Sequence, residues 1–293
     1  MLPYPNASPA KVWTVLDVLR WTTAHFERHG LATARLDAEL LAARAFGMTR
    51  IHLYTHFDRP LSPRELADYR GLVSRRLAGE PVAYLLGKKE FWSFDLQVDR
   101  CVLIPRPDSE TLVEEGLERL ADPEAAWRIA DVGTGSGALI LALVKERPMA
   151  QAFATDISAD ALAVARANAD RLGLPVTFLQ GDLAAPLTGP FDLIVANLPY
   201  VPSGDIQGLP ADVRSEPLLA LDGGSDGLEL VRRLIETAPA LLGPAGCLAV
   251  EIGAGQAEAT AGLLAAGGFT DIRKRRDLAG VERVVSGVRG ALS

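Results

Sequence analysis

The most constraining feature of this sequence is a regular alternation, after Pro123, between short apolar runs and longer stretches with helical periodicity. Such alternation is typical of βαβ units, in which helices cover a mostly parallel sheet. The last two runs have no helical pattern between them, which predicts an antiparallel pair at one edge of the sheet. We therefore expect an α/β protein with a Rossmann-like sheet, whose strands are residues 127–132, 152–155, 176–180, 191–196, 247–252, 270–274 and 282–288.

Polar residues follow several of these strands, where ligands of open α/β sheets bind. The first strand runs into a glycine loop, Asp131–Gly137, in which Gly133, Gly135 and Gly137 would let the backbone approach a ligand closely. Asp156, at the end of the next strand, has the position of an acid that binds two ribose hydroxyls. Taken together, the loop and Asp156 favour a nucleoside-bearing ligand over a purely structural turn.

Two further acids favour S-adenosylmethionine over a dinucleotide as that ligand. The carboxylate of Asp131 would be unfavourable beside a pyrophosphate, but it suits an ammonium and a sulfonium. Asp182, after the third strand, has the position to accept a hydrogen bond from an adenine amino group, although a turn cap is an almost equal alternative. The predicted cofactor site also includes the neighbouring Thr134, Ser136 and Leu183.

The fourth strand ends in the segment Asn197-Leu198-Pro199-Tyr200. Pro199 holds Leu198 in an extended conformation, so that the Asn197 side-chain oxygen and the Leu198 carbonyl could face one small space. Tyr200 offers a flat ring beside them. Two acceptors and a ring predict a receptor for a planar NH₂ group, with these four residues as the catalytic set and Asn197 also near the cofactor.

The 293-residue chain carries a formal net charge of −7, which argues against nucleic acid as its main partner. No apolar run is long enough for a transmembrane helix, and the first ten residues lack the pattern of a secretory signal. We therefore expect a cytoplasmic protein, and a monomer. Cys101 and Cys247 are expected to be buried thiols.

The region before the sheet is expected to form two parts. Residues 1–85 are predicted to be a domain of four or five short helices for substrate recognition, with Ser62-Pro63-Arg64-Glu65 as one helix start. His52 and His56 could share a helix face, but no partner at ligand spacing accompanies them, so we expect no metal site. Residues 86–107 are predicted to be a β-hairpin and an extended connector leading into a catalytic domain, 108–293.

The connector contains aromatic residues with two possible roles. Phe91 and Trp92 precede a turn expected near Ser93, where composition favours hairpin packing over a lid on a ligand. Phe91 is nevertheless included in the predicted cofactor site. Asp108 or Ser109 is expected to cap the next helix.

Together, the glycine loop, Asp156, Asp182 and Asn197–Tyr200 resemble the class I S-adenosylmethionine-dependent methyltransferases that modify planar NH₂ groups. The closer resemblance is to the peptide chain release factor N5-glutamine methyltransferases, and it covers nearly the whole chain. The segments that carry it are Glu80–Tyr84, Gly87 with Phe91, Leu103–Glu110, Ser215–Pro217, Asp226–Leu228, Glu251–Gly253 and Gln256.

This resemblance implies a protein-(glutamine-N5) methyltransferase of translation termination. Such an enzyme transfers methyl from S-adenosylmethionine to the glutamine of the Gly-Gly-Gln loop of class 1 release factors, and S-adenosylhomocysteine is the product. The chain departs from the family at Leu198, where the usual residue is a second proline. Leucine supplies the same backbone carbonyl, but its φ angle is less restricted.

Three alternatives are open to the sequence. An adenine-N6 methyltransferase acting on nucleic acid would use the same acceptors, but it would need a basic groove. A small-molecule methyltransferase would leave the helical N-terminal region unexplained, and an NAD-binding module would leave Asn197–Tyr200 unexplained. The basic run Arg273–Arg276 is read as charge on an edge strand rather than as an RNA contact.

Overall fold

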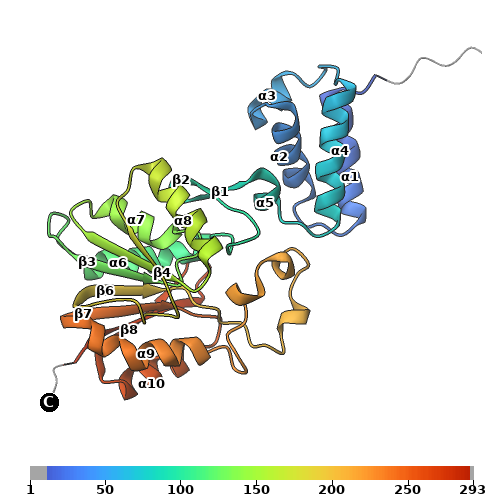
Figure 1. Cartoon of the computed structure of the whole chain (residues 1–293). Coiled ribbons are helices and arrows are strands. Elements are labelled where there is room, and N and C mark those ends of the chain that lie inside the picture. Colours follow the sequence, from blue (N-terminus) through green and yellow to red (C-terminus); the bar gives the residue numbers. More distant parts are fainter. Residues whose placement is uncertain (1–11, 291–293) are drawn as a thin grey trace, which may run out of the picture. The chain divides into compact units, whose positions relative to one another are not determined.

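The computed structural model describes residues 12–290 (Figure 1). The chain divides between Leu86 and Gly87 into two compact units, each with its own core. The segment in which the sequence shows no secretory signal, residues 1–10, lies outside the described residues. Within the described part, none of the helices has the length and apolar character needed to span a membrane.

The first unit consists of five helices, as the periodicity predicts. They are α1 (Val15–Arg28), α2 (Ala34–Phe46), α3 (Arg50–Thr55), α4 (Pro63–Leu77) and α5 (Val82–Leu86). The predicted start of α4 is confirmed, because Ser62 Oγ accepts from Glu65 N and the Glu65 carboxylate accepts from Ser62 N. Phe26, Leu41 and Leu53 form part of a core that these helices enclose.

The second unit opens with the predicted hairpin, β1 (Lys88–Phe91) and β2 (Phe94–Gln97). Trp92 and Ser93 both have positive φ, 47° and 59°, which is the backbone of a two-residue hairpin turn. The Trp92 backbone N–H donates to Glu110 at 3.0 Å and its indole N–H donates to Glu146 at 2.9 Å. The hairpin tip is thus fixed to Glu110 and Glu146 of the same unit by hydrogen bonds.

The predicted seven-stranded sheet is confirmed, with the order β5-β4-β3-β6-β7-β9-β8. The first five of these strands are parallel, and β9 runs antiparallel to both of its neighbours. The bounds are β3 (Arg128–Val132), β4 (Gln151–Asp156), β5 (Thr177–Gln180), β6 (Phe191–Ala196), β7 (Leu242–Glu251), β8 (Phe269–Arg276) and β9 (Glu282–Arg289).

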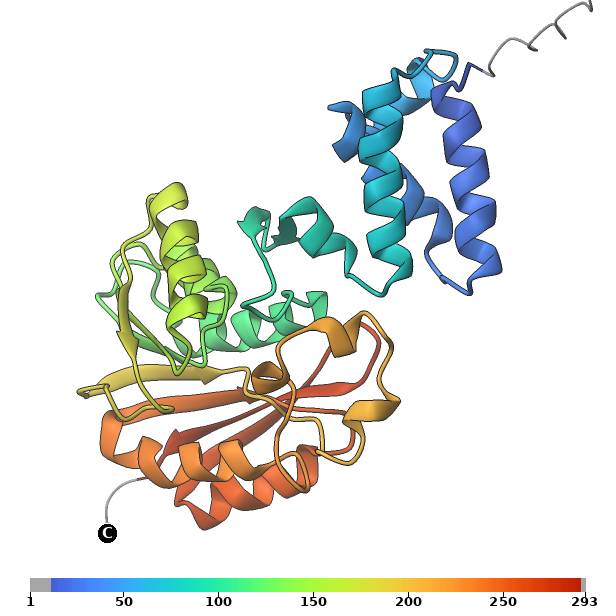
Figure 2. The same ribbon diagram turned by 45° about the vertical axis from the view of Figure 1, so that its right-hand side comes forward.

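Helices cover both faces of this sheet (Figures 1 and 2). One face packs α6 (Glu110–Arg119), α7 (Ala138–Glu146) and α8 (Ala159–Leu172) against residues such as Leu193 and Val195. The other packs α9 (Glu229–Leu241) and α10 (Ala257–Ala266) against Ile194 and Ala196. Because side chains alternate along a strand, β6 serves both cores and is covered on both sides.

A long loop, residues 197–228, joins β6 to α9 and contains three short 3₁₀ turns, Ile206–Gly208, Val213–Ser215 and Leu218–Ala220. It is pinned near its start, where the Val201 and Asp222 segments form an isolated bridge. The Gln256 side chain strengthens this point by donating to the Tyr200 carbonyl at 3.0 Å. The backbone of the chain after β6 is therefore held in place at Tyr200 and Val201.

Three sequence expectations need correction or refinement. Cys247 is buried as expected, but Cys101 is exposed because it follows the hairpin on the surface of the unit. Ser109 makes no cap hydrogen bond, since it ends a 3₁₀ turn, Pro107–Ser109, that runs directly into α6. The basic run lies on β8, the edge strand, where its side chains pair with acids such as Glu258, Glu114 and Glu282.

Candidate active site

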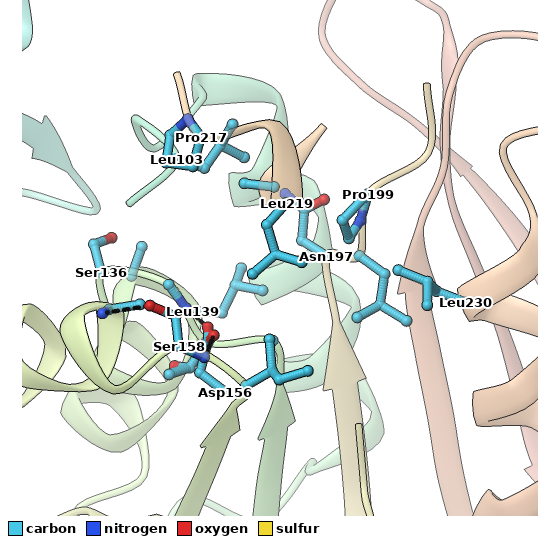
Figure 3. A pocket seen from close by; sticks show the side chains of 18 of the residues that line it. Leu103, Ser136, Leu139, Asp156, Ser158, Asn197, Pro199, Pro217, Leu219 and Leu230 are labelled. Atoms are coloured by element: carbon cyan, nitrogen blue, oxygen red, sulfur yellow. Dashed lines mark hydrogen bonds between the residues drawn. The ribbon is translucent and has the colours of Figure 1, made fainter. Parts of the chain in front are cut away.

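A pocket of about 350 Å³ opens at the carboxyl ends of β3, β4 and β6, in the size range of small-molecule sites (Figure 3). The structure brings eleven of the residues predicted for the site to its wall. These are Phe91, Gly133, Thr134, Gly135, Ser136, Asp156, Asp182, Leu183, Asn197, Leu198 and Pro199. Asp131, Gly137 and Tyr200 are not part of the lining.

The glycine loop takes the backbone conformation for which its glycines are suited. Gly133 and Gly135 have φ angles of 76° and 54°, a region that side chains disfavour. The loop is tied to β4, because the N–H groups of Gly133 and Thr134 both donate to the Thr155 carbonyl at 2.9 Å. A Cβ atom on Gly133 would lie 3.0 Å from Leu198 Cδ2, so the loop passes close to the segment Asn197–Tyr200.

Asp131 lies beneath this loop with its carboxyl group fully buried. Its Oδ2 accepts from the Thr134 hydroxyl at 2.6 Å, and its Oδ1 has no hydrogen-bond partner within residues 12–290. The pKa of Asp131 is raised to about 7, mainly by burial and also by the negative charge of Asp156, against the lowering effect of the Thr134 hydrogen bond. A buried carboxylate oxygen without a partner fits a cationic ligand, which would favour its charged form.

Asp156 faces the pocket with both oxygens held by backbone donors (Figure 3). Oδ2 accepts from Gly135 N and Oδ1 accepts from Ser158 N, each at 2.9 Å. A carboxylate has about four acceptor positions, so this one is oriented and still able to accept from two hydroxyls. The arrangement suits the ribose of a nucleoside.

Asp182 is exposed at the pocket wall and forms an ion pair with Arg233 of α9. Arg233 also lines the pocket, and nothing in the sequence pattern indicated that it would. Beside this pair, Leu183 has a φ of 48° and its carbonyl accepts from the Thr155 hydroxyl at 2.8 Å. The turn after β5 is therefore held in place. The Asp182 carboxylate pairs with Arg233, and Asp182 also lines the pocket.

Asn197 comes directly after β6, at the pocket mouth. Its Nδ2 donates to Ser109 Oγ at 3.2 Å, which leaves Oδ1 as the amide atom available to a substrate. The next residue, Leu198, is buried, with 3% of its surface exposed. Burial raises the pKa of Tyr200 to about 12, as does the charge of Glu251, so its phenol is neutral at physiological pH.

Several residues around this segment were not assigned a role by sequence reasoning. Glu216 accepts from the Ile104 backbone N–H at 2.9 Å and also pairs with Arg106, which lines the pocket. Glu251, at the end of β7, is a buried acid beside Asn197. The segments that contain these residues carried the family resemblance, and that was the one available signal.

The fold and the site define a class of protein, the class I S-adenosylmethionine-dependent methyltransferases. A family model described as "Methyltransferase small domain" matches residues 109–208. Two solved structures share the fold. One is the 16S rRNA N2 G1207 methyltransferase of Thermus thermophilus with AdoMet and guanosine, at TM-score 0.51 and 20% identity over 69% of this chain and 49% of that one. The other is the hMettl16 catalytic domain, at TM-score 0.55 and 15% identity over 76% and 82%.

The chain belongs to the release factor glutamine methyltransferase family. A family model described as "PrmC N-terminal domain" matches residues 17–87. The release factor glutamine methyltransferase of Geobacter sulfurreducens is 46% identical over 94% of this chain and 97% of its own length. That of Moorella thermoacetica is 48% identical over 87% and 91%.

Proposed function

We propose that this chain methylates the side-chain amide nitrogen of the glutamine in the Gly-Gly-Gln loop of class 1 release factors, with Asn197–Tyr200 as its catalytic segment. The single observation that carries the proposal is the orientation of Asn197. Its Nδ2 donates to Ser109 Oγ at 3.2 Å and the residue lines the pocket beside the glycine loop, so Oδ1 is the amide atom that we propose accepts from the substrate. An amide acceptor at that position suits a substrate NH₂ group.

The pocket residues fit S-adenosylmethionine. The free oxygen of Asp131 suits the charged methionine end, Asp156 suits the ribose, and Asp182 suits the adenine amino group. The open glycine loop and the Phe91 ring complete the cofactor site that we propose. When bound, S-adenosylmethionine supplies the methyl group: its methyl–sulfur bond breaks as the amide nitrogen bonds the methyl carbon, leaving S-adenosylhomocysteine.

The protein's part in the reaction is to position and polarise the substrate amide. An amide nitrogen is a poor nucleophile because its lone pair is delocalised into the carbonyl group. Accepting its two N–H bonds at Asn197 Oδ1 and at the Leu198 carbonyl would aim the nitrogen and stabilise the positive charge that develops on it. Tyr200 would pack against the amide plane, and the released proton passes from the nitrogen to water.

The pocket mouth suits a protein substrate. Leu219 lines the pocket and is 58% exposed, and its neighbour Leu218 is 59% exposed. An exposed apolar pair at the entrance to a site is typical of a surface that contacts another protein. We infer that the helical unit before residue 86 adds recognition of the release factor, and that the enzyme acts in the cytoplasm as a monomer without contacting nucleic acid.

The decisive experiment is transfer of radiolabelled methyl from S-adenosylmethionine to a purified class 1 release factor. We expect label in the intact release factor and none in a variant whose loop glutamine is replaced by alanine. Equal labelling of both would reject the substrate. Labelling of DNA or RNA in place of the release factor would support the adenine-N6 alternative, and light scattering of the enzyme checks the monomer.

A further inference from the structure

We propose that Glu251 and Ser109 are positioning residues, which together fix the orientation of the Asn197 side-chain amide. This inference rests on the proposed function, because it concerns how the acceptor in that reaction is held. An asparagine amide is nearly symmetrical in shape but not in chemistry, since a 180° flip exchanges its acceptor and its donor. A flipped Asn197 would turn N–H groups towards the substrate N–H groups and could not accept from them.

The sheet places Glu251 beside Asn197. The parallel pairing of β6 and β7 matches Ala196 with Val250, so the next residues along the two strands are Asn197 and Glu251. Val195 and Ala249 are also paired, and they lie two residues before Asn197 and Glu251. Both belong to the core under α6 and α7. By the alternation of side chains, Asn197 and Glu251 face the same side of the sheet, where Ser109 directly precedes α6.

The environment of Glu251 restricts what its carboxyl group can do. The residue is 1% exposed, and Oε2 has no hydrogen-bond partner in the described part of the chain. Burial raises the pKa of Glu251 to about 7, while hydrogen bonds from Ser109 and Asn197 and the charge of Arg283 act in the opposite direction. A buried acid with an incomplete set of partners is costly to the fold, which favours a functional reason for its presence.

When the Glu251 carboxyl group is ionised, the groups around it leave one consistent arrangement of protons. An ionised carboxylate can only accept, so the groups of Ser109 and Asn197 that face it must donate. Ser109 then gives its single proton to Glu251, and its lone pairs are left to accept from Asn197 Nδ2, as observed at 3.2 Å. Both neighbours therefore require the NH₂ group of Asn197, and Oδ1 is left for the substrate.

A charged acceptor behind the amide has a second effect. Hydrogen bonds to an ionised group are stronger than those between neutral groups, and they polarise the group that donates. Donation from Nδ2 to Glu251 would make Oδ1 a stronger acceptor for the amide hydrogens of the substrate. The positive charge that develops on the substrate nitrogen would be stabilised accordingly.

The test compares Glu251→Met and Glu251→Gln with the wild type. Methionine fills a similar volume without an acceptor, and glutamine restores an acceptor oxygen. For Glu251→Met we expect kcat to fall about 10- to 100-fold, the range for losing a hydrogen bond to a charged group. We expect the Kd for S-adenosylmethionine to stay unchanged and the melting temperature to stay equal or rise. Glu251→Gln should recover part of the lost turnover, because it restores an acceptor oxygen without the charge.

A double-mutant comparison separates positioning from a general structural effect. If Glu251 acts through Asn197, adding Glu251→Met to Asn197→Ala should reduce the residual turnover no further. Glu115→Gln is the matched control, since Glu115 is another buried acid of this unit, paired with Arg119 away from the pocket. It should lower the melting temperature and leave kcat unchanged.

The outcomes distinguish this inference from the proposed function. A wild-type enzyme that does not label the release factor would reject the function itself. If the wild type is active, the positioning role is overturned by any of three results: normal turnover in Glu251→Met, no recovery in Glu251→Gln, or a further loss in the Asn197→Ala background.

Discussion

Glu216 Oε2 accepts a hydrogen bond from the backbone nitrogen of Ile104 at 2.9 Å, across 112 residues of sequence. The same carboxylate pairs with Arg106, and its side chain is 1% exposed. The loop after β6 is thereby joined to the segment before α6, and both segments contribute residues to the pocket wall. One buried acid thus holds together two sides of the site.

Replacing this acid should loosen the pocket. In Glu216→Ala, the Ile104 N–H and the Arg106 guanidinium lose their acceptor, and we expect the free energy of unfolding to fall by about 1–3 kcal/mol. Arg106 is one-third exposed, which keeps the figure below that of a fully buried pair. Glu216→Gln keeps an acceptor for Ile104 and should lose less. Urea denaturation of the two variants checks the order, and equal losses would contradict it.

Asn197→Ala should separate catalysis from cofactor binding. Removing one preorganised acceptor costs on the order of 10²–10³ in turnover, because its effect is felt mainly in the transition state. The cofactor site that we propose is built mostly from other residues, so the Kd for S-adenosylmethionine should change little. Single-turnover methyl transfer and calorimetric binding measure the two quantities. Near-normal transfer would remove Asn197 from the catalytic set.

The affinity for S-adenosylmethionine should depend on pH through Asp131. Since the folded pKa of Asp131 is raised to about 7, its carboxyl group is largely protonated below that pH and charged above it. A cationic ligand favours the charged form, so the Kd should fall as pH rises from 6 to 8. Asp131→Asn should bind more weakly and lose this dependence. An unchanged pH profile in Asp131→Asn would show that another group is responsible.

The Asp131 carboxyl group also makes the stability of the folded protein depend on pH. Its contribution to stability falls as pH rises, whereas the affinity for S-adenosylmethionine increases. Its pKa is raised above the ordinary value of 3.8, so the folded protein holds a proton that the unfolded chain releases. The contribution of Asp131 to the free energy of unfolding therefore declines as pH rises from about 4 to 7. Without ligand, Asp131→Asn should be more stable than the wild type at pH 8. Thermal unfolding with and without S-adenosylmethionine tests both signs.

Gly133→Ala should damage both stability and cofactor binding. The residue has a φ of 76°, and the new Cβ would lie 3.0 Å from Leu198 Cδ2, so we expect a cost of about 1–2 kcal/mol and a weaker Kd for S-adenosylmethionine. Gly262→Ala is the control, because it lies in α10 with open space at its Cβ position. That variant should gain roughly 0.5–1 kcal/mol. Similar effects at both positions would contradict the strain argument.

Leu219→Asp should weaken capture of the release factor. A charge on this exposed residue of the pocket mouth opposes contact with an apolar protein surface, and we expect KM for the release factor to rise about tenfold, equivalent to about 1.4 kcal/mol. Leu278→Asp is the matched control, because Leu278 is fully exposed and is not part of the pocket lining. Steady-state kinetics compare them. Equal KM values in the two variants would exclude Leu219 from substrate binding.

The sequence predicted the fold because local patterns decide it. Buried strands, helical periodicity and the hairpin turn near Ser93 each extend over few residues, and the topology of α/β sheets leaves few alternatives. The positions of Asp156 and Asn197 at strand ends followed from the same rule. These features depend on neighbours along the chain, and sequence alone records those neighbours directly.

The rest of the site depends on contacts between distant segments. Ser109 was expected to cap a helix, yet its hydroxyl accepts from Asn197, 88 positions away. Arg233 meets Asp182, and Glu251 faces Asn197 across a strand pairing. Such contacts depend on the register and order of the strands, and the hydrophobic periodicity of the sequence reveals neither. The exposure of Cys101 was not predicted for the same reason, because apolar neighbours along the sequence do not determine whether a side chain is buried in the fold.

The strand order has a consequence for folding of the enzyme during its synthesis on the ribosome. Asn197 lies at the end of β6, but its partner Glu251 lies in β7, and β7 is itself flanked by β9. A nascent chain that has emerged only as far as Tyr200 contains the segment that we propose to be catalytic, but not Glu251. If Glu251 orients Asn197 as we propose, the acceptor is complete only once β7 has paired with β6.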